Sequence, residues 1–194
     1  MSADRTAALA DFCTIFQGGR HKLSGNDFVP AGFPAYGADG MNGYLPMREF
    51  SQPAIVLSSI GARCGKCFHA DGEWTSLANT QIILPDSERA DTRFLWHQLN
   101  DEGRWPRSGT AQPFIKPSDV KAHRVFLPPL AEQRRIAAIL DEADALRANR
   151  RAALAQLDEM ARAIFVEMFG DPATNPKDHS IVPLKRIGRL DRGV

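Results

Sequence analysis

The residue types with the clearest potential for chemistry are two cysteines, Cys64 and Cys67, set among glycines as Cys-Gly-Lys-Cys. A structural zinc site needs four ligands, usually from two such pairs, and the sequence holds no second pair. A thioredoxin-type redox site places the pair at the start of a helix after a strand. This pair lies in a glycine-rich turn between two expected strands, so neither zinc nor redox chemistry is favoured.

Other catalytic signatures are incomplete. The run from Gly61 to Lys66 resembles a phosphate-binding loop, but it is one residue short between the glycines and has Cys67 where Ser or Thr would bind magnesium. The sequence contains no GxSxG, no HExxH, no dinucleotide-binding glycine signature and no carboxylate–lysine nuclease cluster. These absences favour a binding role over catalysis.

The distribution of charge is more informative than the net charge of +1. Acidic and basic residues are equally numerous in residues 1–130, but the segments 12–26, 50–70 and 103–118 contain no acid. Together these segments can form a basic face for a polyanion. Their basic side chains are Arg20, Lys22, Arg63, Lys66, Arg104, Arg107 and Lys116.

The elements that must position these side chains are mostly short strands. Apolar, β-branched runs predict strands at 54–60, 80–84 and 125–127. Residues 91–99 predict a short helix, residues 9–16 a strand or a helix, and residues 34–43 a glycine-dense loop. The expected fold class is therefore α+β, with a strand-rich domain before a long helix.

A single long helix is predicted between Pro128-Pro129 and Gly170, because about 40 residues follow the prolines without Gly or Pro. Its length is roughly 58 Å at about 1.5 Å per residue. Apolar residues recur at alternating spacings of three and four, as in a coiled coil. We expect this apolar seam to pair with another helix, most simply in a second copy; packing on its own domain is the alternative. The expected dimerisation residues are Ile136, Ile139, Ala143, Leu146, Leu157, Met160 and Ile164.

The length and composition of the chain limit the number of domains and the class of protein that it can be. The 194 residues are 43% hydrophobic and 24% charged, which suits one core plus an appendage. We expect a domain over residues 1–127, a spacer or dimerisation helix over 128–170, and a linker leading to an incomplete domain over 171–194. No apolar run is long enough for a membrane span, and the N-terminus does not resemble a signal peptide, so a cytoplasmic protein without a membrane partner is expected.

Two blocks of sequence resemble the specificity (S) subunit of Type I restriction–modification enzymes. The first is Phe33-Pro-Ala-Tyr-Gly-Ala-Asp-Gly-Met-Asn-Gly-Tyr44 with the strand and glycine turn that follow, similar to a target-recognition domain. The second is Leu127-Pro-Pro-Leu-Ala-Glu-Gln133 before the long helix, similar to the junction with a spacer helix. Phe169-Gly-Asp-Pro172 resembles the end of that helix.

The resemblance implies a DNA-recognition subunit without catalysis or cofactors of its own. Its partners would be double-stranded DNA, methylase (M) subunits that use S-adenosylmethionine to methylate adenine, and restriction (R) subunits that use ATP and magnesium. The family carries two recognition domains and two spacer helices per chain, and this sequence has one of each. Residues 183–194 resemble the opening of a second domain, so the chain is expected to be either a half subunit that works as a dimer or a fragment.

Within that resemblance, roles can be assigned by side-chain chemistry. We expect Asn42, Arg63, Lys66 and Gln112 to read base edges. Arg20, Lys22, Arg104, Arg107 and Lys116 are expected to hold phosphates, and Tyr36 to stack on DNA or to pack in the core. Trp74 and Trp96 are expected in the core.

Two competing hypotheses remain at this stage. The first is a truncated coiled-coil interaction protein without DNA recognition. The second is a metal- or thiol-dependent enzyme built on Cys64 and Cys67.

Overall fold

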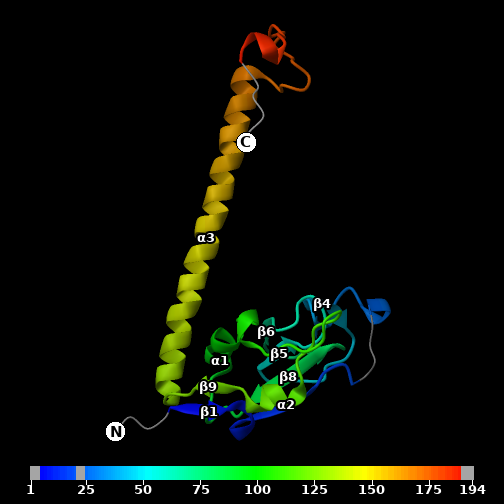
Figure 1. Ribbon diagram of the computed structural model, residues 1–194, viewed down its shortest axis with the longest axis vertical. Coiled ribbons are helices and arrows are strands. Elements are labelled where there is room, and N and C mark those ends of the chain that lie inside the picture. Colours follow the sequence, from blue (N-terminus) through cyan, green and yellow to red (C-terminus); the bar gives the residue numbers. More distant parts are fainter. Residues whose placement is uncertain (1–4, 21–24, 189–194) are drawn as a thin grey trace. The chain divides into compact units, whose positions relative to one another are not determined.

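The structure is a computed structural model that describes residues 5–20 and 25–188 (Figure 1). The chain divides into two compact units, the first ending at Asp141 and the second beginning at Glu142. The first unit holds strands, short helices and the first turns of the long helix α3 (Leu130–Phe169). The expected fold class, a strand-rich α+β domain followed by one long helix, is confirmed.

A four-stranded antiparallel sheet forms the centre of the first unit. All three runs predicted as strands are confirmed. The runs at 54–60 and 80–84 form β5 and β8, which pair with each other, and the run at 125–127 corresponds to β9. The sequence did not indicate that two further short strands, β6 and β7, lie between β5 and β8 in the chain. The sheet order is β2 (Cys13–Gln17), β8 (Thr80–Pro85), β5 (Ala54–Ser58) and β6 (Cys67–Ala70).

Both faces of this central sheet are covered, because its strands alternate apolar side chains between two buried clusters. Ile55, Leu57 and Ile83 face one cluster, and Val56 and Ile82 face the other. All five are fully buried. This continuous burial explains why β5 and β8 read as unbroken apolar runs rather than as an alternating pattern.

Short helices cover the first face. Helix α1 (Thr92–Leu99) buries Leu95 and Leu99, and α2 (Pro117–Ala122) buries Val120. Asp91 caps α1 by accepting a hydrogen bond from the Phe94 backbone N–H at 2.9 Å. Strands β1 (Thr6–Ala8) and β9 (Arg124–Phe126) pair antiparallel beside them. The 3-10 helices are η1 (Leu9–Asp11), η2 (Gly25–Asp27), η3 (Glu102–Arg104) and η4 (Leu184–Arg186).

A three-stranded sheet covers the second face, in the order β4 (Gly40–Leu45), β3 (Phe33–Gly37) and β7 (Thr75–Ser76). The prediction of a loop at 34–43 is therefore wrong, since β3 and β4 form a hairpin there. The glycines serve its tight turn, and Gly40 has a φ of +109° that side chains disfavour. The high glycine content of residues 34–43 predicted a loop, but these glycines belong to a hairpin.

Residues 9–16 combine the two alternatives left open for them, a 3-10 turn followed by β2. Both tryptophans expected in the core pack inward. Trp74 is fully buried and donates its indole N–H to the Gln52 carbonyl at 3.0 Å. Trp96 is half-buried and donates to the Cys67 carbonyl at 3.0 Å.

Helix α3 is continuous for 40 residues, and Gly170 follows it with a φ of +81°, the left-handed cap expected from the sequence. Within the first unit the helix packs through one face, formed by Gln133, Ala137 and Asp141. Gln133 and Ala137 are buried. Among the described helices the next longest, α1, has 8 residues, so the described chain holds no helix of matching length.

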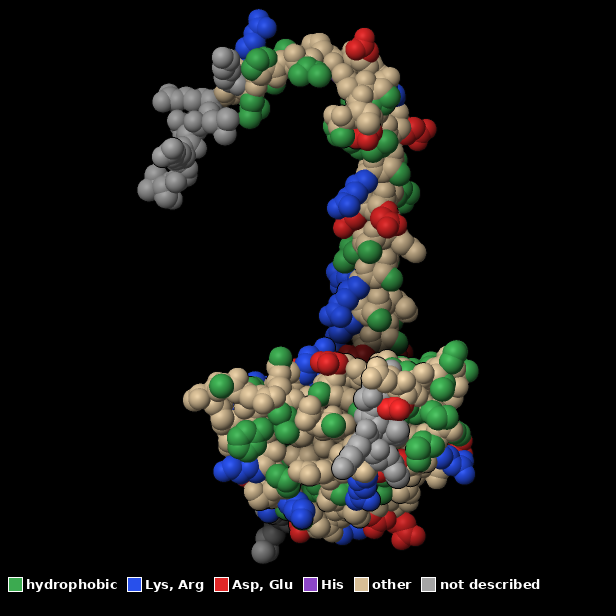
Figure 2. Space-filling view, turned by 90° about the vertical axis from the view of Figure 1, so that its right-hand side faces the viewer, with side chains coloured by type: hydrophobic (Ala, Val, Ile, Leu, Met, Phe, Trp, Pro, Cys, Tyr) green, Lys and Arg blue, Asp and Glu red, His purple; other side chains and the backbone are tan. Residues whose placement is uncertain are grey.

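The expected seam lies on a different side of the helix from this docked face, roughly 140° away at about 100° per residue. Ile136 and Ala143 are half-buried, and the other five seam residues are exposed. Figure 2 shows hydrophobic side chains at the surface along the length of the helix. The exposed fractions are Ile139 52%, Leu146 63%, Leu157 55%, Met160 53% and Ile164 49%.

Candidate nucleic-acid interface

The central sheet has one end at which its connecting loops gather. Strands β2 and β5 finish there, and β6 and β8 begin there, because neighbouring strands run antiparallel. We call this the loop end of the sheet. All three acid-free segments are connected to it, as the backbone hydrogen bonds show.

The first segment leaves β2 and turns at Gly18-Gly19. The Gly18 N–H bonds to the Thr80 carbonyl at 3.0 Å, and the Gly19 N–H bonds to Ser76 Oγ at 3.2 Å. A Cβ on Gly18 would lie 2.2 Å from Thr80 Oγ1, so this turn tolerates no side chain there. Arg20 follows, exposed, with its guanidinium 4.3 Å from the centroid of the Phe16 ring. Lys22 lies outside the described residues.

The second segment is the turn between β5 and β6. The Gly65 N–H bonds back to the Ser58 carbonyl at 2.8 Å, and the Lys66 N–H bonds to the Arg63 carbonyl at 2.9 Å. Arg63 is exposed, and its guanidinium lies 5.9 Å from the centroid of the Phe68 ring. Lys66 is half-buried. The predicted base-reading pair therefore sits on one tight turn at the loop end.

The third segment is attached to the second by backbone pairing. The Gly61 N–H bonds to the Pro113 carbonyl, and the Ile115 N–H bonds to the Ser59 carbonyl, both at 3.0 Å. Gln112 and Lys116 are exposed on this segment. The two candidates are thereby held beside the turn that carries Arg63.

Arg104 and Arg107 belong to the same region but have acidic neighbours. Arg104 Nε lies 3.4 Å from an Asp101 carboxylate oxygen, and an Arg107 guanidinium nitrogen lies 3.7 Å from Glu102. Arg107 also donates to the Glu102 carbonyl at 2.9 Å. These pairs are exposed and weak, so they can exchange for phosphate contacts.

The remaining candidates, Tyr36 and Asn42, lie on the hairpin β3–β4. A Cβ on Gly40 would lie 3.1 Å from the Phe68 ring, so the hairpin turn contacts the residue beneath Arg63. Asn42 is exposed on β4. Tyr36 is half-buried and packs edge-on against Trp74 with ring centroids 5.8 Å apart, and burial raises its pKa. Of its two expected roles, the packing role has a structural basis.

Two residues were given no individual role from the sequence, Asn79 and Gln133. Asn79 is exposed at the loop end with a φ of +64°, and its carbonyl accepts from the Ser59 N–H at 2.9 Å. An asparagine before a β-branched run was the available signal, since asparagine tolerates the left-handed region. Gln133 is fully buried, and its role is structural.

The cysteine pair lies in the buried core of the first unit. Among the described residues, no group of three or more His, Cys, Asp or Glu side chains is placed to hold a metal ion. Cys64 and Cys67 are free and buried, and burial raises the pKa of both thiols. The Cys67 thiol donates to the Leu99 carbonyl at 3.3 Å. Both side chains therefore behave as core residues.

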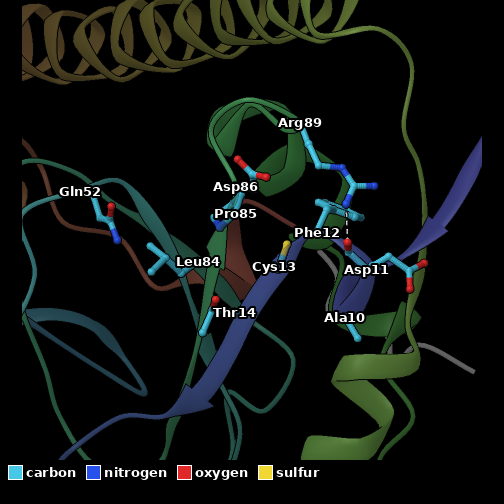
Figure 3. Close-up of a pocket in the computed structure, with 10 residues that line it drawn as sticks. All are labelled: Ala10, Asp11, Phe12, Cys13, Thr14, Gln52, Leu84, Pro85, Asp86 and Arg89. Atoms are coloured by element: carbon cyan, nitrogen blue, oxygen red, sulfur yellow. Dashed lines mark hydrogen bonds between the residues drawn. The ribbon is translucent and has the colours of Figure 1, made fainter.

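A cavity of about 300 Å³ lies at the opposite end of the sheet, where β2 begins and β8 ends (Figure 3). Arg89 lines it and donates to the Asp11 carbonyl beside it. Burial raises the pKa of Cys13, which lines the cavity, to about 12, so the thiol stays protonated near neutral pH. Cys13 is therefore not activated as a nucleophile.

The comparisons with known proteins decide the family. The Type I restriction modification DNA specificity domain matches residues 5–158. The chain belongs to this family. That assignment confirms the resemblance found in the sequence. Among described helices, none is long and apolar enough to cross a membrane.

Individual relatives are distant. The specificity subunit of the Type I restriction enzyme EcoprrI from Escherichia coli is 24% identical over 115 residues, covering 59% of this chain and 28% of that protein. The S subunit from M. genitalium matches with a TM-score of 0.57 and 20% identity, over 87% of this chain and 46% of that one. The HsdS subunit from Thermoanaerobacter tengcongensis matches with a TM-score of 0.60 and 21% identity, over 88% and 46%. The chain thus spans less than half of each relative.

Proposed function

We propose that this chain is a DNA sequence-recognition subunit of a Type I restriction–modification system, and that its loop end contacts duplex DNA and reads one half-site. The observation that carries the proposal is the gathering of three acid-free segments at one end of one sheet, by backbone bonds such as Gly61 to Pro113 and Gly18 to Thr80. Membership of the DNA specificity family supports the choice of DNA as the polyanion.

The chemistry of the interface divides into positioning and reading. Arginine and lysine side chains hold phosphates irrespective of sequence, whereas paired donors and acceptors on arginine, asparagine and glutamine distinguish base edges. The loop end carries both kinds of side chain. The chain itself catalyses no reaction under this proposal. Adenine methylation and DNA cleavage belong to the M and R subunits, which bind S-adenosylmethionine, ATP and magnesium.

Helix α3 supplies the second half of the proposal. Its exposed apolar seam pairs with the same helix of a second copy, and two recognition domains then read a bipartite site. A two-fold pair of identical readers recognises a symmetric site, as other dimeric DNA-binding proteins do. The helix length, about 60 Å for 40 residues, sets the number of base pairs between the half-sites.

The test is DNA binding as a function of salt concentration. Binding through phosphates gives a linear fall of log K with log salt, and each lost phosphate contact reduces the slope by about 1. Lys116→Glu and Arg107→Glu, at two expected phosphate contacts, should weaken binding about tenfold or more. Arg134→Glu is the matched control, because Arg134 is exposed and lines a depression with Pro85 at the opposite end of the sheet.

Equal loss for the control and the loop-end variants would show that binding depends on overall charge and not on this surface. A protein that forms dimers but binds no DNA at low salt would support the alternative, a coiled-coil interaction protein. Unchanged binding in a Cys64→Ala/Cys67→Ala variant would exclude a thiol-dependent role.

A further inference from the structure

Two arginines at the loop end are supported by phenylalanines on the same side of the central sheet. Arg20 lies over Phe16 of β2, and Arg63 lies over Phe68 of β6. Strands β2 and β6 are the two edges of the sheet. Phe16 and Phe68 both pack against the buried cluster beneath the three-stranded sheet. The two arginines are therefore seated in equivalent ways at opposite edges.

The phenylalanine beneath Arg20 is held by more ring contacts than the one beneath Arg63. Phe16 stacks with Phe50 at a centroid distance of 5.6 Å and an interplanar angle of 23°. Phe50 stacks in turn with Trp74 at 4.3 Å and 25°. Trp74 is fully buried, and its backbone exchanges two hydrogen bonds with that of Phe50, at 2.9 and 3.0 Å. The ring beneath Arg20 is thus fixed by contacts that reach the core.

This seat restricts the orientation of the guanidinium group. A cation over an aromatic face is attracted to it, and a planar guanidinium also stacks on the ring. Among the described residues, no carboxylate forms an ion pair with Arg20. Its N–H groups thus keep their hydrogen-bonding capacity for a ligand while the plane is held.

The backbone before Arg20 is also held in place. A Cβ on Gly19 would lie 2.6 Å from the Ala78 backbone, and the φ of Gly19 is +74°. A Cβ on Gly18 would lie still closer to its neighbour, 2.2 Å from Thr80 Oγ1. The turn therefore packs closely against the segment that precedes β8. This close packing places Arg20 over the Phe16 ring.

We propose that Arg20 reads a guanine at the loop end, rather than holding a phosphate as its sequence position suggested. The assignment rests on the proposed function. A phosphate is recognised equally well by a mobile lysine, so a phosphate contact needs no aromatic seat. A guanine presents O6 and N7 to an arginine in one plane, and a preorganised guanidinium loses less freedom on making that pair of bonds. Phe16 acts as the positioning residue.

The experiment is selection of preferred sequences from a pool of DNA duplexes with a randomised core, using the full chain and the variants Arg20→Lys, Arg20→Ala, Phe16→Leu and Phe16→Tyr. Arg20→Lys keeps the charge, so the salt dependence should stay as in the wild type. Discrimination at one G·C pair should fall about tenfold or more. Phe16→Leu should weaken discrimination at that same pair only. Phe16→Tyr keeps an aromatic ring beneath Arg20, so it should discriminate as the wild type does.

Arg104→Lys is the matched control and should alter no position, because a phosphate contact survives that exchange. The melting temperature of each variant checks that Phe16→Leu remains folded. If Arg20→Lys keeps the wild-type preference at every position, or Arg20→Ala weakens all sequences equally, Arg20 is a phosphate contact and the inference is wrong. A wild-type chain that selects no sequence would instead overturn the proposed function itself.

Discussion

Arg93 of α1 donates from its Nε to both carboxylate oxygens of Asp141 on α3, at 2.8 and 3.1 Å. His97, one turn further along α1, contacts the same carboxylate at 2.8 Å. Asp141 is the last residue of the first compact unit. We call this cluster of Arg93, His97 and Asp141 the clasp, and it holds α3 against α1 within the first unit.

The clasp predicts a pH-dependent contribution to stability. Burial raises the pKa of Asp141, but hydrogen bonds from His97 and Arg93 and their charges lower it by more, so the net pKa lies below its ordinary value. A lowered folded-state pKa stabilises the fold at pH values above the unfolded pKa, about 3.9. That stabilisation is lost as the pH falls through the folded value.

Asp141→Asn should therefore lower the free energy of unfolding at pH 7, by less than about 1 kcal/mol because the side chain is partly exposed. The difference from the wild type should shrink as the pH falls below the unfolded pKa and through the lowered folded pKa. Urea unfolding followed by tryptophan fluorescence measures this, since all three tryptophans lie in the first unit. Asp144→Asn, which breaks an exposed pair with Arg147 on α3, is the control. A constant difference from pH 7 to pH 3 would contradict the mechanism.

The buried hydrogen bonds of Gln133 predict a larger effect on the free energy of unfolding. Its side chain is fully buried and makes three hydrogen bonds, accepting from the Asp91 N–H at 2.8 Å and donating to the carbonyls of Arg89 at 3.0 Å and Pro128 at 2.8 Å. Gln133→Leu leaves these backbone groups unsatisfied and should cost about 2–4 kcal/mol of unfolding free energy. The same urea titration measures it.

Gln98→Leu serves as the comparison for Gln133. Gln98 makes two bonds with the Phe126 backbone in a half-buried position, so water can replace it and the cost should be about 1 kcal/mol. Equal stabilities of Gln133→Leu and the wild type would show that the junction does not depend on this side chain.

The apolar seam predicts the state of assembly. Ile139→Glu/Leu146→Glu should convert a dimer into monomers, because two charges would be buried between helices. Light scattering gives the mass of each protein. Arg151→Glu changes charge on the same stretch of helix but away from the seam, and it should leave the mass unchanged. A wild type that is monomeric at high concentration would remove the helix pair from the proposed function.

The burial of Cys64 and Cys67 predicts that their thiols are unreactive in the folded protein. At pH 8 Cys64 and Cys67 should react with a thiol reagent only after unfolding, because burial raises the pKa of both thiols and shields them. Absorbance of the released reagent in native buffer and in urea gives the comparison. Rapid reaction of two or three thiols in the native protein would reopen a thiol-dependent role.

The sequence was informative where one local signal determines the structure. The long helix followed from 40 residues without a breaker between Pro129 and Gly170, and the glycine past its end adopts the expected conformation. Strands β5 and β8 followed from apolar runs that are buried on both faces. The β3–β4 hairpin was missed because its glycines serve a regular turn, and β6 and β7 are too short to form a readable pattern.

The candidate interface was harder to read, because it depends on pairing between distant segments. Acid-free segments indicated a basic face, but nothing local shows that Pro113 bonds to Gly61 or that Phe16 supports Arg20. The expected role of Arg20 came from charge alone, which does not distinguish a free guanidinium from a stacked one. Gln133 stood in a recognised motif, yet its three backbone partners lie up to 44 residues away.

Selection from a randomised duplex pool with the wild-type chain tests the central claim most directly. We expect two enriched half-sites separated by a fixed number of unspecified base pairs, with binding that weakens steeply as salt rises. A pool that remains random after repeated selection, at salt concentrations where the chain still binds DNA, would contradict sequence reading by this domain.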